Sequence, residues 1–338
     1  MEYGAIDLHS QRSLIRIVDA DGAVLLDRTV ASRREGFMGV FADRARMRVL
    51  LESGTESEWV AATLEACGHE VIVADPNYAL MYGARGRAVK TDRRDVAALA
   101  EACRLGIYRR AHRVSAAQRE VRRVLRVREQ LVRQRTQLIC LLRAQLRQEG
   151  YRLPSGSSET AAARCRALSL PAALVAQLTP VLTMLEALGP VIAALDAETT
   201  QRAAADPVVQ RLMTVPGVGP IVGLTFRAVV DDVDRFADAQ QCTAYLGLVP
   251  REASSGARQR KGAITKAGPS SLRVALIQAS WAMWRQRQGR AALHAWVERL
   301  AARRGRRVAV VGLARRLARI LYAMWRDGTD YRAVPLAA

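Results

Sequence analysis

The sequence has 338 residues, enough for two or three domains with cores of their own, and its hydrophobic content of 50% excludes a largely disordered chain. Its 52 Lys and Arg residues against 32 Asp and Glu give a net charge of +20, which predicts a polyanionic partner, above all nucleic acid. No uninterrupted apolar stretch reaches about 18 residues and the N-terminus lacks a signal-peptide pattern, so we expect a cytoplasmic protein without a membrane partner.

The first third of the chain has the pattern of an α/β unit. Short apolar runs predict strands, and apolar residues at helical spacing predict helices between them. The predicted strands cover residues 4–9, 13–18, 23–30, 48–52 and 70–74, and the predicted helices cover residues 34–46 and 57–67. The resulting order, βββαβαβ, is the layout of a ribonuclease-H-like core.

Residues 115–150 have the clearest helical pattern in the chain. Apolar residues repeat every seven positions with a second apolar row beside them, and arginines surround this seam. The seam predicts coiled-coil-like packing, either on the chain's own core or between protomers, and the two can coexist. Further helix is expected to about residue 205. The seam residues are Leu125, Val132, Ile139 and Leu146, with Val124, Leu131 and Leu138 in the second row.

The last third is expected to be mainly α-helical. A Gly-rich turn at residues 215–222 separates two helical segments, followed by a helix at 240–246, a polar loop at 250–269 and a long helix containing Trp281 and Trp284. The turn would present the backbone of Gly217 and Gly219 to a phosphate, although a tight helix–helix turn needs the same glycines. We therefore predict three domains, residues 1–112, 113–205 and 206–332.

The positive charge is concentrated in two segments. Residues 104–152 hold fourteen arginines against three glutamates, and residues 285–332 hold thirteen arginines against three acids. This pattern predicts two surfaces that contact a polyanion, with Arg122 and Arg126 among the candidates in the first. Arginines that merely cover solvated helix faces are the alternative interpretation.

Four carboxylates are candidate metal ligands. Asp7 lies among apolar residues in the middle of the first predicted strand, where an unpaired charge is costly, and Glu52 ends the fourth. Asp92 and Asp95 begin a predicted helix, and their i,i+3 spacing places them on one face. Converging carboxylates suit Mg²⁺ (or Mn²⁺), which prefers oxygen ligands. Glu56 is the alternative to Glu52, and helix capping is the alternative role for the aspartates.

A second candidate centre is the loop of residues 247–268. Ser255 precedes a glycine among several cations, so its hydroxyl is a candidate nucleophile for a phosphodiester whose charge they neutralise. Ser254 is the alternative nucleophile, and a loop that only touches phosphate is the simpler interpretation. The candidate nucleic-acid contacts here are Arg251, Arg258, Arg260, Lys261 and Lys266, and Lys90 is another beside the predicted acids.

Together these motifs resemble the DEDD transposases of the IS110 insertion-sequence family. The resemblance covers nearly the whole chain in order: an Ile-Asp-x-His strand at 6–9, a strand-ending glutamate at 52, Lys-Thr-Asp-x-x-Asp at 90–95, Pro-Gly-x-Gly at 216–219, and the Gly-Leu-x-Pro, Ser-Gly and Ile-Thr-Lys-x-Gly sequences within 247–268. It implies a RuvC-like N-terminal domain and a C-terminal transposase domain. It also implies that an acidic tetrad holds Mg²⁺ and a C-terminal serine is the nucleophile, which map to Asp7, Glu52, Asp92, Asp95 and Ser255.

The resemblance further implies guidance by a structured bridge RNA that pairs with donor and target DNA, and action as a multimer. We therefore expect a site-specific DNA recombinase that works as a dimer or tetramer through a serine–phosphodiester intermediate. One alternative is a RuvC-like nuclease in which metal-activated water attacks. A second alternative is a non-catalytic scaffold that binds nucleic acid.

Overall fold

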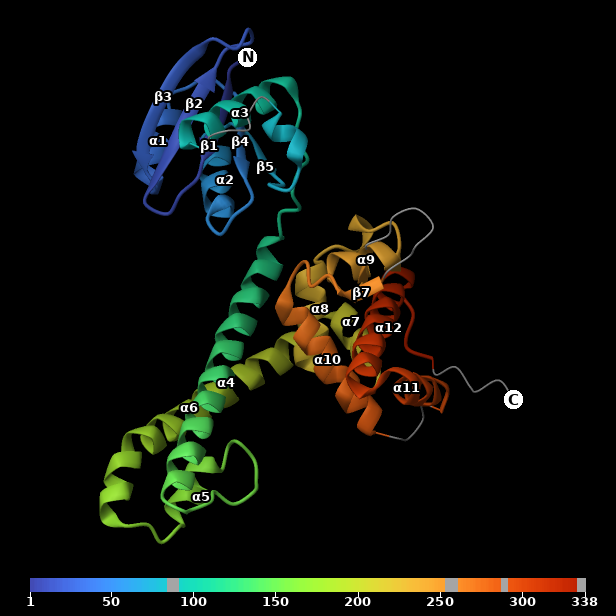
Figure 1. The fold of residues 1–338 in the computed structure, drawn as a ribbon. Coiled ribbons are helices and arrows are strands. Elements are labelled where there is room, and N and C mark those ends of the chain that lie inside the picture. The colour runs from blue at the N-terminus through green and yellow to red at the C-terminus, as the bar shows by residue number, and fades with distance from the viewer. Residues whose placement is uncertain (84–90, 253–260, 287–290, 333–338) are drawn as a thin grey trace. The chain divides into compact units, whose positions relative to one another are not determined.

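A computed structural model describes residues 1–83, 91–252, 261–286 and 291–332 (Figure 1). The chain divides into two compact units, Met1–Arg113 and Val114–Ala338. The first unit contains a five-stranded sheet, whereas the described part of the second is mostly helical. This mixed composition confirms the predicted combination of an α/β region with α-helical regions.

The first unit is built around one mixed sheet with the strand order β3-β2-β1-β4-β5. Strands β1, β2 and β3 pair antiparallel, whereas β1–β4 and β4–β5 are parallel. The observed element order agrees with the predicted βββαβαβ pattern. The elements are β1 (Tyr3–Asp7), β2 (Arg12–Val18), β3 (Val24–Ala31), α1 (Arg34–Phe41), β4 (Arg48–Glu52), α2 (Ser57–Ala66), β5 (Glu70–Ala74), the 3₁₀ helix η1 (Ala79–Tyr82) and α3 (Asp92–Leu105).

Both faces of this sheet are covered, because alternate strand residues point to opposite sides. Ile6 of β1 belongs to the cluster formed with α1 and α2, whereas its neighbour Ala5 packs in the cluster formed with α3. The sheet is therefore the middle of three layers, with α1 and α2 on one side and α3 on the other.

Helix α1 is shorter than the sequence predicted. It ends at Phe41, although helical spacing extended the prediction to residue 46. Phe37, Val40 and Phe41 are buried, and the next buried residue, Met47, already leads into β4. The helix ends where its apolar face ends.

The second unit contains two long helices followed by a helical bundle. The predicted polar loop at 250–269 proves to contain two short paired strands, which is a correction to the prediction. The elements are α4 (Ala116–Gln148), α5 (Ala161–Arg166), α6 (Ala172–Ala205), α7 (Pro207–Met213), α8 (Pro220–Val230), η2 (Val233–Arg235), α9 (Ala239–Tyr245), β6 (Pro250–Glu252), β7 (Lys261–Ile264), α10 (Ser270–Arg285), α11 (Ala291–Arg304) and α12 (Arg306–Asp327).

The apolar seam of α4 packs within the chain. Ile139 and Leu146 are buried with residues of α5 and α6, and Leu125 packs near Leu224 of α8. On the same helix, Val127 and Leu141 are exposed by 52% and 45%. The intrachain packing explains the heptad pattern, and the exposed apolar residues leave part of α4 uncovered in the single chain.

Helix α6 is unusually apolar for its exposure. Its most apolar 18-residue window has a mean hydropathy of 1.7, and 22% of that window is buried. Length and composition alone would let α6 cross a membrane, a test that helices of soluble proteins also pass. In the described part of the chain it is the one helix that meets this criterion.

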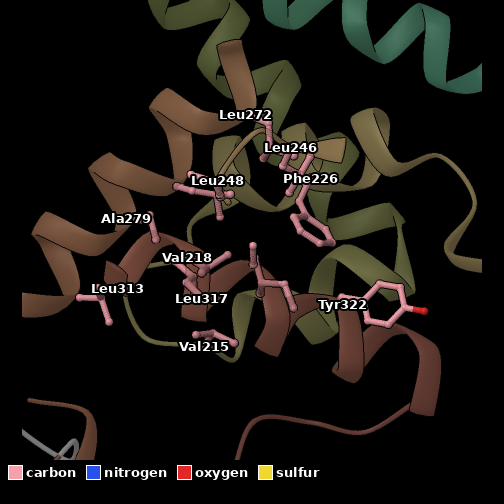
Figure 2. Packing of buried hydrophobic residues seen from close by; sticks show 14 of the residues in the cluster. Val215, Val218, Phe226, Leu246, Leu248, Leu272, Ala279, Leu313, Leu317 and Tyr322 are labelled. Atoms are coloured by element: carbon pink, nitrogen blue, oxygen red, sulfur yellow. The ribbon is translucent and has the colours of Figure 1, made fainter. Parts of the chain in front are cut away.

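The bundle of the second unit has the largest hydrophobic core of the described chain. Val215 and Val218 from the turn between α7 and α8 belong to the same core cluster as Leu313 and Leu317 of α12, and Figure 2 shows Val218 close to Leu317. Tyr322 is fully buried in the same core, and its hydroxyl donates to the carbonyl of Phe236 at 2.6 Å. Side chains of the Gly-rich turn are thus anchored in the hydrophobic core of the second unit.

The two glycines of this turn have different surroundings. Gly217 has φ +87°, and a Cβ there would lie 2.8 Å from the carbonyl oxygen of Ala279 in α10. Gly219 is the N-cap of α8 at φ −101°, and a Cβ there would meet nothing within 4 Å. Close packing therefore requires glycine at Gly217 but not at Gly219.

Replacing Gly217 by alanine should destabilise the chain strongly. The positive φ and the contact with Ala279 together predict a loss of about 2 kcal/mol or more in the free energy of unfolding. Gly219→Ala is the matched control, with an expected loss below about 1 kcal/mol from the N-cap preference. Urea denaturation of both variants measures the difference, and equal losses would contradict the packing role of Gly217.

Candidate active site

Two acidic residues meet at one edge of the sheet in the first unit. The parallel register pairs Ile6 with Leu51, and the next residue of each strand is Asp7 in β1 and Glu52 in β4. Asp7 is thus the last residue of its strand, not a residue in the middle as the sequence suggested. By the two-residue alternation both acids lie on the face of Ala5 and Leu50, which is the face that α3 covers.

The N-terminus of α3 brings two further acids to this edge. Thr91 is the N-cap, and Asp92 and Asp95 occupy the first turn. Asp95 is 8% exposed, whereas the side chain of Asp92 is 70% exposed. The helix dipole favours negative charge at this end, and the i,i+3 spacing places both carboxylates on one side.

His9 joins the cluster just after β1. Its Nε2 lies 3.3 Å from Oδ2 of Asp7 and 3.8 Å from Oδ2 of Asp92. Asp7, His9 and Asp92 each offer one ligand atom, and these three atoms lie within 4.8 Å of one another. Two carboxylate oxygens and an imidazole nitrogen at this spacing are able to share one metal ion.

The electrostatics of Asp7 connect all four predicted acids. Partial burial raises the pKa of Asp7, His9 opposes this increase, and the negative charges of Asp92, Asp95 and Glu52 raise the pKa further. A divalent cation would relieve both the desolvation and the repulsion at this carboxyl group. The donor set and its charge therefore fit a hard divalent metal.

A cleft of about 520 Å³ opens beside Asp7 and contains both candidates for the third acid. Glu52 lies in this cleft, and its Oε1 accepts a hydrogen bond from the hydroxyl of Tyr82. Glu56 lines the same cleft, and its Oε2 is buried without a hydrogen-bond donor among the described residues. Glu52 is among the charges that raise the pKa of Asp7, which favours it over Glu56.

Of the two arginines singled out on α4, Arg122 has a packing role. Its Nε and Nη2 donate to the carbonyls of Ala228 and Val229 at 2.8 and 3.1 Å, and burial lowers the pKa of this guanidinium. Arg126 is exposed and lines a groove of about 500 Å³ between α4, α8 and α10. Arg122 thus ties α4 to the end of α8, whereas Arg126 keeps an exposed charge.

The loop that carries the candidate nucleophile is held at its base. Thr265 and Lys266 donate backbone hydrogen bonds to Val249 at 2.9 Å and Gly247 at 3.1 Å. Arg251 is exposed in β6, Lys261 begins β7, and Lys266 is exposed at φ +57°. Five predicted site residues, Lys90, Ser254, Ser255, Arg258 and Arg260, lie outside the described residues.

Three residues at these sites were not predicted from the sequence. His9 was noted only as part of a motif, although an acid and a histidine two positions apart are a recognisable ligand pair. Tyr82, thirty residues from Glu52, carries no local signal. Arg273 of α10 donates to the carbonyls of Ala267 and Gly268 at 2.8 and 2.9 Å and so holds the end of the loop at residues 247–268. Its sequence pattern is that of an ordinary surface arginine.

Two family models match the chain. The DEDD transposase model of the IS110 group matches residues 5–150, and the model described as "Transposase IS116/IS110/IS902 family" matches residues 209–295. The chain is 31% identical to a "probable family 20 transposase" of Pseudomonas aeruginosa over 97% of both chains. It is 28% identical to the transposase for insertion sequence element IS1111A of Coxiella burnetii, covering 93% of this chain and 87% of the relative.

Replacing Asp7 by asparagine should change the pH dependence of stability in metal-free buffer. Because folding raises the pKa of Asp7, its contribution to stability is complete below the unfolded-state pKa and is lost as pH rises through the folded-state pKa. Asp7→Asn should therefore gain stability relative to the wild type as pH rises above about 4, the usual pKa of an unfolded Asp. Thermal unfolding with a chelator present measures this gain.

Asp75→Asn is the control of opposite sign. The backbone N–H of Asn77 and then Arg109 lower the pKa of Asp75, so its contribution is present above the unfolded-state pKa and is lost as pH falls. This variant should be less stable than the wild type at neutral pH, and the deficit should shrink in acid. A loss of stability in Asp7→Asn at neutral pH, like the loss expected for Asp75→Asn, would contradict the assignment for Asp7.

Proposed function

Because the chain belongs to the IS110 family of insertion-sequence transposases, which cut and rejoin DNA, we propose that its four converging acids form the metal site of a site-specific DNA recombinase. The observation that carries this proposal is the meeting of Asp7 and Glu52 at adjacent strand ends with Asp92 and Asp95 at the start of α3. A ribonuclease-H-like, or RuvC-like, first domain agrees with the strand order and with acids at one edge of the sheet.

The proposed metal is Mg²⁺, or Mn²⁺ in its place. This family is generally dependent on divalent metals, and a bound ion would supply Lewis-acid stabilisation of charge on the phosphoryl oxygens. The four acids Asp7, Glu52, Asp92 and Asp95 would hold the ion, and ligand atoms of Asp7 and Asp92 already lie within 4.8 Å of one another. His9 would orient Asp7 through their 3.3 Å contact or serve as a further ligand.

The proposed nucleophile is Ser255. Its Oγ would form a bond to the phosphorus of a DNA phosphodiester, the bond to one strand's oxygen would break, and that strand would leave with a hydroxyl end. Attack of a hydroxyl from the exchanged strand on the phosphoserine would rejoin the DNA and free the serine. Arg251, Arg258, Arg260, Lys261 and Lys266 would neutralise the phosphate during both steps.

The proposed partners are double-stranded donor and target DNA and a structured bridge RNA, met in the cytoplasm. Support comes from the fourteen arginines at residues 104–152 and the thirteen at residues 285–332. The proposed contacts with nucleic acid include Arg126, Lys90 and the backbone of Gly217 and Gly219. We further propose that the chain acts as a dimer or tetramer joined through α4, with functional domains at 1–112, 113–205 and 206–332.

Replacing Ser255 by alanine should abolish both strand exchange and the covalent protein–DNA adduct. Binding of DNA and RNA should remain within about twofold of the wild type, because a neutral hydroxyl adds little to phosphate affinity. Ser254→Ala is the matched control and should retain the adduct. Denaturing gel electrophoresis of radiolabelled donor DNA detects the adduct. Its persistence in Ser255→Ala would refute the assignment, and cleaved ends without any adduct would indicate a water-dependent nuclease.

Replacing Glu52 by glutamine should lower metal-dependent strand exchange by about a hundredfold or more, because ligand charge contributes several kcal/mol to charge stabilisation. Glu56→Gln, in the same cleft, is the matched control and should lower the rate by less than about tenfold. Strand-exchange rates across a Mg²⁺ titration provide the measurement. A larger loss in Glu56→Gln would transfer the role of third acid to Glu56.

A further inference from the structure

Two tryptophans form a stacked pair at the end of α10. The ring centroids of Trp281 and Trp284 lie 5.4 Å apart with an interplanar angle of 10°. Trp284 is 9% exposed and belongs to the core of the second unit, whereas Trp281 is half-buried at its margin. Both rings line a cavity of about 260 Å³ between α10, α11 and the start of α12. A flat aromatic surface therefore borders an open cavity.

The lining that α11 contributes to this cavity is polar. The indole Nε1 of Trp284 donates to Oε1 of Glu298 at 2.8 Å, and Nε2 of His294 lies 3.8 Å from the same oxygen. The side chain of Glu298 is nevertheless 55% exposed. Both contacts are made by Oε1, so Oε2 can accept hydrogen bonds from a ligand.

Two exposed cations complete the lining. Arg285 ends α10 and Arg306 begins α12, and both border the cavity. They belong to the more C-terminal of the two basic segments, residues 285–332. A ligand with a flat ring, a hydrogen-bond donor and a neighbouring anionic group matches this combination.

We propose that this cavity binds one unpaired nucleobase of the nucleic acid, with its ring on Trp281, its exocyclic amino group on Glu298 and its phosphate near Arg285 and Arg306. The inference rests on the proposed function, in which the chain binds nucleic acid. At about 260 Å³ the cavity is slightly below the roughly 300 Å³ at which small-molecule pockets begin, so it suits one ring system and excludes a duplex.

The carboxylate of Glu298 decides which bases fit. An ionised carboxylate only accepts hydrogen bonds, and guanine, adenine and cytosine each offer an amino group. Uracil and thymine present a single N–H between two carbonyl oxygens, and the carboxylate of Glu298 would repel these oxygens. The cavity should therefore prefer amino-bearing bases over uracil and thymine.

Titration of the full chain with GMP, AMP, CMP and UMP, followed by tryptophan fluorescence, tests the proposal. The first three nucleotides should quench more tightly than UMP. Trp281→Ala should weaken their binding by about five- to 150-fold, since one stacked base contributes about 1–3 kcal/mol, while Trp284 remains as reporter. Trp59→Phe, which alters a tryptophan packed on Phe37 in the first unit, is the matched control and should keep the wild-type affinity.

Glu298→Gln provides a second variant that does not depend on removing a large ring. Its amide both donates and accepts, so UMP should gain affinity relative to CMP. Unchanged base preference in Glu298→Gln, or unchanged affinity in a folded Trp281→Ala, would overturn the proposal. Strand exchange by the wild-type chain tests the proposed function separately, so intact strand exchange without mononucleotide binding would refute the base cavity alone.

Discussion

The parallel pairing of β1 with β4 determines where the acids of the first unit meet. Parallel neighbours end at the same edge of a sheet, and their register makes Asp7 and Glu52 the next residues after the pair Ile6 and Leu51. The two-residue alternation then turns both side chains toward α3, whose first turn carries Asp92. A register shift of one residue in either strand would point the acid of that strand toward α1 and α2, away from the helix that completes the cluster.

Burial of Asp7 and then its repulsion by the other three acids oppose folding in the charged form, and both raise the pKa of Asp7. The two apolar residues that precede Asp7 in β1 compensate: Ala5 and Ile6 are fully buried in separate clusters on the two faces of the sheet. A rigid sheet edge can therefore keep like charges together until a cation neutralises them. Replacing an acid of this site by a neutral residue should therefore stabilise the metal-free fold and weaken metal binding.

The sequence predicted the first unit well because its strands are short, apolar and separated by recognisable turns. Residues 48–52 and 70–74 were predicted with the observed bounds of β4 and β5. Partners were harder to predict. The heptad pattern of α4 is the same whether the helix packs on α6 or on another protomer. Arg122 has the sequence pattern of a surface arginine, although its side chain binds the end of α8. The pairing of β6 with β7 depends on a long-range contact that a polar composition conceals.

Helix α10 connects the nucleic-acid contacts proposed for the second unit. At its start Arg273 holds the base of the loop at residues 247–268, and in its last two turns Ala279 and Met283 receive the turn at Gly217 beside the stacked pair of Trp281 and Trp284. A methyl group at Gly217 would press on the backbone of α10 next to the stacked pair, so a loss of nucleic-acid binding in that variant would combine the effects on the turn and on the helix. Gly219 faces open space and reports on the turn alone. The proposed phosphate binding by the turn can therefore be tested separately from the packing on α10 at Gly219 but not at Gly217.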